Sequence, residues 1–121
     1  MNTYTAFIRG LIRVIIFILL TITYFLVSLC IHITSLDKVN RRRRFSKNGH
    51  FFSRLVCLMV NIKVTIKNPP AHNKAGMLVG NHMGFVDIFS ISSLSPNLFV
   101  TSKEMHQIPV IGLITEFAGC V

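Results

Sequence analysis

The stretch from Val14 to Leu36 limits what this chain can fold into more than any other feature. It reads VIIFILLTITYFLVSLCIHITSL, which is 23 residues without an acidic residue, lysine or arginine, and 17 of them are apolar. A helix that rises about 1.5 Å per residue would be about 35 Å long over this stretch, enough to cross a hydrocarbon core of about 30 Å. We therefore expect a helix embedded in a membrane, which either crosses it fully or lies with the segment at 51–60 in one leaflet.

A cleavable signal peptide is the main alternative for this stretch. The apolar region of a signal peptide has about 7–15 residues and ends in small residues. Here the run is longer and leads into TSLDKVNRRRR, whose positive charges resist translocation. The sequence favours a retained membrane helix.

The positive charge of the chain is concentrated beside this helix. The net charge is +9, but residues 1–67 hold 11 of the 13 basic residues and one acidic residue, whereas residues 68–121 hold two basic and three acidic residues. A basic run next to a membrane helix is better explained by anionic lipid headgroups than by nucleic acid. Because more basic residues follow the helix than precede it, we expect the C-terminal side to be cytoplasmic. We expect no nucleic-acid partner.

After the basic run, short apolar segments alternate with segments of helical length. We expect strands at 62–66, 77–80 and 98–101, and helices at 86–94 and 103–117, the last interrupted at Pro109. This order of elements is typical of an α/β fold. We place a domain boundary after the basic run. Residues 1–47 form a membrane anchor with its juxtamembrane polybasic segment, and residues 48–121 form the α/β domain.

One further helical stripe lies between these parts. Phe51, Leu55 and Met59 recur at a spacing of four residues, which indicates an apolar helix face too short to cross a bilayer. This segment could lie in the membrane interface or pack on the domain that follows. The sequence leaves both open.

The candidate chemistry lies in the segment Asn81-His82-Met83-Gly84-Phe85-Val86-Asp87, between an expected strand and an expected helix. On one continuous helix His82 and Asp87 would be rotated about 140° from each other, but a loop that turns at Gly84 can bring them together. A histidine backed by a carboxylate is a recurring general base. The spacing alone also fits a helix-capping Asp87 and a solvated His82.

Cysteine and histidine positions give no metal or disulfide pattern. The three cysteines, at 30, 57 and 120, are scattered among apolar residues, which excludes a disulfide scaffold and a zinc ribbon. The remaining histidines match no ligand spacing; they are His32, His50, His72 and His106. We expect no metal and no cofactor.

The N-H-x4-D pattern at 81–87, after a short apolar strand and a membrane segment, resembles motif I of the glycerolipid acyltransferases, in particular the 1-acyl-sn-glycerol-3-phosphate acyltransferases. The stretch VTSKEMHQIPVIGLITEFAGCV at 100–121 is similar to the next block of that family and matches it at Lys103, Pro109, Gly112 and Gly119. The resemblance covers about residues 48–121.

The resemblance implies transfer of a fatty acyl group from acyl-CoA or acyl-carrier protein to the free hydroxyl of a lysophospholipid, at the cytoplasmic side of a bacterial cell membrane. By analogy, His82 would deprotonate that hydroxyl, Asp87 would orient His82, and Asn81 would support the loop. Lys103 would lie near the acceptor phosphate, although a solvated lysine at a helix start fits the sequence equally well.

The chain also departs from the family. The later blocks of the family, including an arginine and a Phe-Pro-Glu-Gly-Thr block associated with acceptor binding, do not occur in these 121 residues. We therefore expect the N-terminal portion of an acyltransferase, with an incomplete sheet and little activity of its own. The alternative is a non-catalytic, membrane-anchored lipid-binding or interaction protein derived from such an enzyme.

Overall fold

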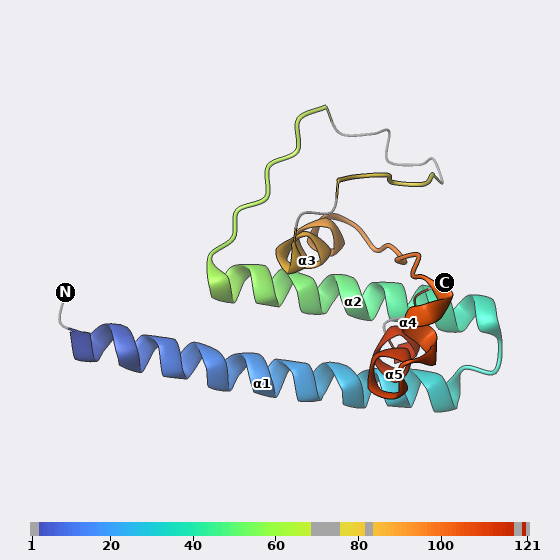
Figure 1. The fold of residues 1–121 in the computed structure, drawn as a ribbon, viewed down its shortest axis with the longest axis horizontal. Helices are drawn as coiled ribbons and strands as arrows, with labels where there is room; N and C mark the ends of the chain where they lie inside the picture. Colours follow the sequence, from blue (N-terminus) through green and yellow to red (C-terminus); the bar gives the residue numbers. More distant parts are fainter. Residues whose placement is uncertain (1–2, 69–75, 82–83, 118–119, 121) are drawn as a thin grey trace.

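The computed structural model describes residues 3–68, 76–81, 84–117 and 120, and its elements are five helices (Figure 1). They are α1 (Thr3–Thr34), α2 (Lys38–Val60), α3 (Phe85–Leu94), α4 (Lys103–Gln107) and α5 (Pro109–Phe117). Helices α1 and α2 form an antiparallel hairpin, α3 packs on α2, and α5 packs on α1. The hairpin is therefore the scaffold on which the other helices are placed.

Helix α1 is the expected apolar helix, and it begins further toward the N-terminus than the uncharged run. It is long and apolar enough to cross a membrane, and 6% of its most apolar 18-residue window is buried. Three of its threonines use their hydroxyl groups within the helix: Thr21, Thr23 and Thr34 donate to the carbonyl oxygens four residues earlier, at 2.7–2.8 Å. Such bonds make polar side chains compatible with apolar surroundings.

Helix α2 begins and ends at residues suited to those positions. The Asp37 carboxylate accepts hydrogen bonds from the backbone N–H groups of Val39 and Asn40, at 3.3 and 3.2 Å, which caps the helix. At the other end Asn61 takes a left-handed conformation (φ 59°), and the N–H of Ile62 donates to the carbonyl of Cys57 at 2.8 Å. The boundary between residues 47 and 48 falls inside α2.

The contact between α1 and α2 combines polar and aromatic groups. Asn48 Nδ2 donates to the hydroxyl of Ser28 at 3.0 Å, and Ser28 is 0% exposed. The rings of Tyr24 and Phe52 lie 4.9 Å apart. The segment around 51–60, whose packing the sequence left open, is the C-terminal half of α2, a helix that contacts both α1 and α3.

Helix α5 is held against α1 by its C-terminal end. The Tyr24 hydroxyl donates to the carbonyl of Phe117 at 3.3 Å, and the Phe117 ring meets the rings of Phe25 and His32 edge to face. The expected interruption at Pro109 is confirmed, because α4 ends at Gln107 and α5 begins with the proline. Proline suits a first helical position, where its missing N–H is not needed.

The expected strands are where the structure differs most from the prediction. Residues 62–66, 77–80 and 98–101 form no strand in the described part of the chain. Met77, Leu78 and Val79, expected in a strand, are exposed. A strand needs a neighbour for its N–H and C=O groups, and none of the described segments pairs with these residues. The α/β fold with its incomplete sheet is therefore unconfirmed, and the described chain is helical.

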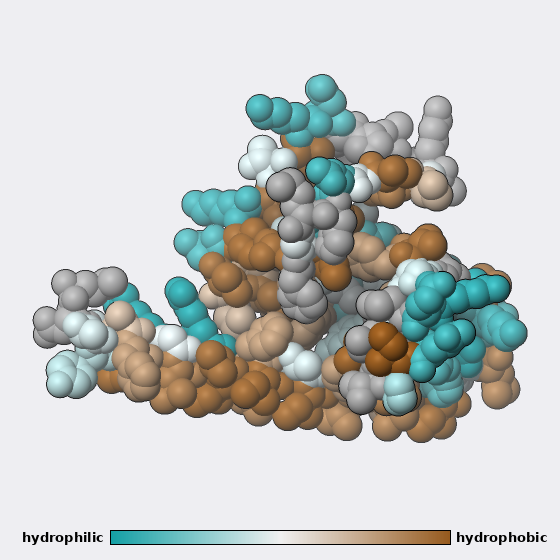
Figure 2. Space-filling model, in the orientation of Figure 1, coloured by the Kyte–Doolittle hydropathy of each residue, from teal (hydrophilic) through white to brown (hydrophobic). Residues whose placement is uncertain are grey.

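The chain buries little apolar surface. Its accessible surface is 9752 Å², whereas a compact monomer of 13.7 kDa would expose about 6,600 Å². The buried apolar side chains among the described residues are Phe45, Val56 and Cys57, all on α2. Figure 2 shows the corresponding apolar surface along α1.

Candidate active site

Asp87 lies in the first turn of α3, directly after the segment with the candidate motif. Its carboxylate oxygen Oδ2 accepts a hydrogen bond from the backbone N–H of Gly84 at 3.0 Å, and its own N–H donates to the carbonyl of Gly84 at 3.1 Å. A carboxylate at this position also interacts favourably with the positive end of the helix dipole. The half-buried Asp87 is thus fixed at the helix start.

These bonds match the capping interpretation without excluding the catalytic one. An ionised carboxylate offers about four acceptor positions on two oxygens, so one backbone hydrogen bond leaves capacity for others. A capped carboxylate is also held in one orientation, which is what a residue that positions a histidine requires.

Helix α2 determines where α3, and with it Asp87, is placed. The Phe52 and Phe89 rings lie 6.0 Å apart, and the Cys57 thiol donates to the carbonyl of Phe89 at 3.7 Å. One turn later, Nδ1 of His50 lies 2.7 Å from the carbonyl of Ser92. Because a carbonyl only accepts, this contact requires the proton of His50 on Nδ1. His50 therefore serves the packing of α3.

The other predicted site residues are distributed over different segments. Asn81 is exposed and ends the described segment 76–81. His82 lies outside the described residues, so its pairing with Asp87 stays a prediction. Lys103 is exposed at the first position of α4, which packs on α5, whereas α3 packs on α2. Lys103 and Asp87 thus belong to helices with different neighbours.

The Glu104 carboxyl, next to Lys103, and the Cys120 thiol have shifted pKa values. The backbone N–H of Glu104 and the hydroxyl of Ser102 lower the pKa of the exposed Glu104 carboxyl, so a negative charge stands beside Lys103. Burial raises the pKa of the Cys120 thiol, although its backbone hydrogen bond acts in the opposite direction. A thiol with a raised pKa is a poor nucleophile at neutral pH.

Within the described ranges no group of three or more histidine, cysteine, aspartate or glutamate side chains could hold a metal ion.

Comparison with known proteins confirms the resemblance to acyltransferases. The chain is 30% identical over 67 residues to the 1-acyl-sn-glycerol-3-phosphate acyltransferase of Neisseria meningitidis, a match that covers 54% of this chain and 26% of the relative. It is 25% identical over 80 residues to the lyso-ornithine lipid O-acyltransferase of Rhizobium meliloti, covering 66% of this chain and 26% of the relative. It is 35% identical over 48 residues to a lysophospholipid acyltransferase of Arabidopsis thaliana, covering 40% and 12%.

The matched region spans about a quarter of the two bacterial relatives. No family model matches the chain. No solved structure matches it significantly either. The similarity therefore rests on the curated acyltransferases.

Proposed function

We propose that this chain belongs to a membrane-bound O-acyltransferase that moves a fatty acyl group from acyl-CoA or acyl-carrier protein to the free hydroxyl of lysophosphatidic acid. The observation that carries the proposal is the N-H-x4-D motif, whose aspartate lies in the first turn of α3 with its carboxylate held by Gly84. The names of the relatives support the reaction class. Their acceptors differ, so lysophosphatidic acid is the acceptor to test first.

In the proposed reaction, His82 takes the proton of the acceptor hydroxyl as the oxygen attacks the thioester carbonyl. The oxygen attacks the donor directly, so no acyl-enzyme forms, and the thiolate of the donor leaves as it takes the proton from the His82 imidazolium. Asp87 orients His82 and stabilises the imidazolium, and Asn81 supports the loop between them. Lys103 lies near the acceptor phosphate.

The membrane forms part of the proposal. Helix α1 would be embedded, with the basic residues that follow it at the cytoplasmic face of a bacterial membrane. Helix α2 runs antiparallel beside α1 and carries seven basic residues, so a fully crossing α1 would draw charges such as Arg54 into the hydrocarbon, where each costs about 3 kcal/mol or more. The hairpin would therefore lie in one leaflet, with α1 toward the hydrocarbon and the basic residues of α2 among the lipid headgroups. An acceptor that is itself a lipid would then reach the site from the membrane.

The test uses the full-length product of the gene that encodes these residues, assayed in membranes with lysophosphatidic acid and labelled acyl-CoA. Replacing His82 by alanine removes the general base, so we expect phosphatidic acid formation to fall by about a hundredfold or more. His72→Ala, outside the motif, is the matched control and should retain activity. Activity retained in the His82→Ala protein would contradict the assignment.

Asp87→Asn separates capping from catalysis. An asparagine side chain still accepts the hydrogen bond from Gly84 but carries no charge to stabilise an imidazolium, so we expect activity to fall while the melting temperature stays unchanged. Asp37→Asn, at the cap of α2, is the control and should leave activity intact. If the wild-type protein forms no product from either donor, the non-catalytic lipid-binding alternative is favoured.

A further inference from the structure

An open pocket lies at the junction of α1 and α2, at the other end of α2 from the contact between Cys57 and Phe89. Its volume is about 500 Å³, and it is lined by Thr34, Ser35, Leu36, Asp37, Asn40, Arg43, Arg44 and Lys47. The four lining residues of α2 are spaced i, i+3, i+4 and i+7, which places them on one helix face. The candidate acyltransferase motif contributes no residue to it.

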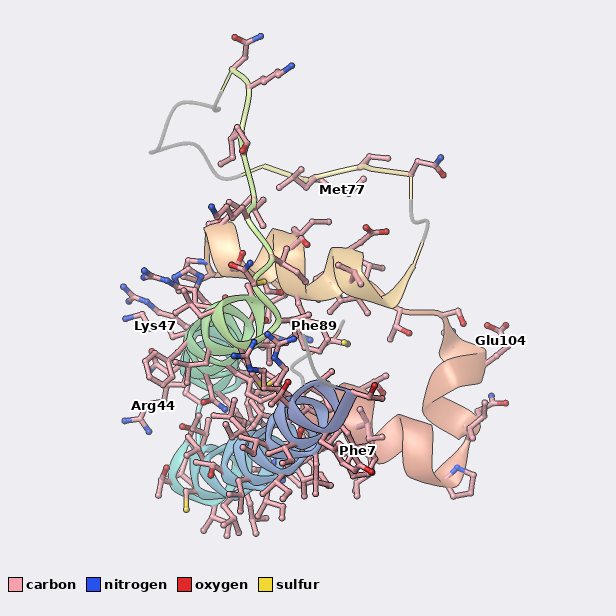
Figure 3. All side chains as sticks on the ribbon, turned by 90° about the vertical axis from the view of Figure 1, so that its left-hand side faces the viewer. Phe7, Arg44, Lys47, Met77, Phe89 and Glu104 are labelled. Atoms are coloured by element: carbon pink, nitrogen blue, oxygen red, sulfur yellow. The ribbon has the colours of Figure 1, made fainter. Side chains whose placement is uncertain are left out.

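The pocket is strongly basic. Arg43, Arg44 and Lys47 are exposed and contribute three positive charges, against the one carboxylate of Asp37. That carboxylate is already engaged by the N–H groups of Val39 and Asn40. Figure 3 shows Arg44 and Lys47 on the same side of the hairpin and Glu104 on the opposite side. The pocket thus combines surplus positive charge with hydroxyl and amide groups.

One wall of the pocket is held in place by hydrogen bonds. Nη1 of Arg44 donates to the hydroxyl oxygens of Thr34 and Ser35, at 3.3 and 3.2 Å. Ser35 is buried, and its N–H donates to the carbonyl of Ile31 at 3.0 Å. Phe45, which follows Arg44, is 3% exposed. A guanidinium held by one nitrogen has further N–H donors that can bind the oxygens of an anion.

We propose that this pocket binds the phosphate group of an anionic phospholipid. Phosphate oxygens fit arginine donors, and the pocket begins where the exposed apolar surface of α1 ends, at the level of the headgroups for an embedded helix. The lipid assignment rests on the proposed insertion of α1 but not on acyl transfer. Free phosphate has the same recognition chemistry and is distinguished by the experiment below.

A bound phosphate in a formed pocket differs from diffuse attraction to a charged surface. Diffuse attraction depends on the number of basic residues, whereas a pocket depends on which helix face carries them. Lys38 and Arg42 serve as a control pair for Arg43 and Lys47. Each pair consists of one lysine and one arginine four residues apart, and all four residues are exposed on α2. Lys38 and Arg42 do not line the pocket and lie about 140° round the helix from the other pair.

The experiment measures binding of phosphatidylglycerol to the purified protein in micelles of an uncharged detergent. This lipid is neither the acceptor nor the product of the proposed reaction, so the acyltransferase site does not enter the result. We expect Arg43→Gln with Lys47→Gln to raise the Kd about tenfold. We expect Lys38→Gln with Arg42→Gln to change it by no more than about twofold. If a double variant fails to fold, the single variants Lys47→Gln and Lys38→Gln are compared instead.

Competition identifies the source of the phosphate group. If inorganic phosphate displaces phosphatidylglycerol and binds with the same pocket dependence, the site takes free phosphate, and if it does not displace the lipid, the site requires the lipid headgroup. Either result supports a phosphate site. Equal weakening by the two double variants would overturn it, as would binding of diacylglycerol, which lacks phosphate, as tightly as phosphatidylglycerol.

Discussion

Helices α1 and α2 pack against each other, yet they present opposite chemistry to their surroundings. In α1 the exposed side chains are apolar around most of the circumference, and its two basic residues, Arg9 and Arg13, stand near its N-terminus. In α2 seven basic residues share the surface with a few exposed apolar ones. Figure 2 shows the brown surface along α1.

Because of this difference, the exposed surfaces of the two helices suit different surroundings. A contiguous apolar surface of this length is costly in water, so α1 requires lipid or another apolar partner. A helix with one face on α1 and α3 and the other basic is suited to a boundary between an apolar phase and water. The hairpin thus joins a helix with an apolar surface to one with a basic surface.

Among these predictions, the largest effect is expected from charges in the middle of α1, which should weaken the association of the protein with the membrane. Leu19 and Ile22 are 58% and 51% exposed, and arginine at both should cost about 5 to 7 kcal/mol of membrane insertion. We expect the wild-type protein to stay with membranes washed at high salt, and Leu19→Arg with Ile22→Arg to move to the soluble or aggregated fraction.

The matched change on α2 is Val39→Arg with Leu58→Arg, at two exposed apolar positions. This variant should remain with the membrane, because interfacial positions tolerate arginine. Release of the wild-type protein by salt alone would show that α1 is not inserted.

Two neighbouring phenylalanines of α2 test its packed face against its exposed face. Phe52 contacts Tyr24 of α1 and Phe89 of α3, whereas Phe51 is 63% exposed. Phe52→Ala should lower the free energy of unfolding by about 3 kcal/mol, measured by denaturant titration in detergent. Phe51→Ala should change it by less than about 1 kcal/mol. If the two changes lower the free energy of unfolding equally, the contact of Phe52 with Tyr24 and Phe89 does not hold α3 in place.

The parts of the fold that the sequence predicts are those decided locally. An uncharged apolar run of this length folds as a helix wherever it lies, and the break at Pro109 follows from the missing N–H of proline. The start of α2 was missed because the arginine run has no apolar periodicity, although Asp37 is a capping residue. The helix face that lines the pocket was also missed. The spacing of its residues at i, i+3, i+4 and i+7, from Asn40 to Lys47, could have indicated it.

The parts that sequence reasoning does not settle depend on distant partners. A strand exists only if another strand lies beside it, so the β-branched residues of 62–66 and the apolar run at 77–80 could indicate strands without fixing any pairing. Asp87 illustrates the same limit in the site. Its place at the start of a helix follows from the local pattern, whereas its pairing with His82 depends on how the loop folds back.

The cap of α2 gives the smallest expected effect and tests whether the hairpin turn is itself a stabilising element. Asp37→Ala removes the acceptor of the Val39 and Asn40 N–H groups, which should lower the free energy of unfolding by about 1 kcal/mol. Asp37→Asn keeps an acceptor and should cost only a few tenths of that amount, so the difference between the two variants measures the cap. Helix α1 has no comparable dependence, because an apolar helix in lipid retains its backbone hydrogen bonds without a cap. If the alanine and asparagine variants unfold alike, the order of α2 comes from its packing on α1 and α3 alone.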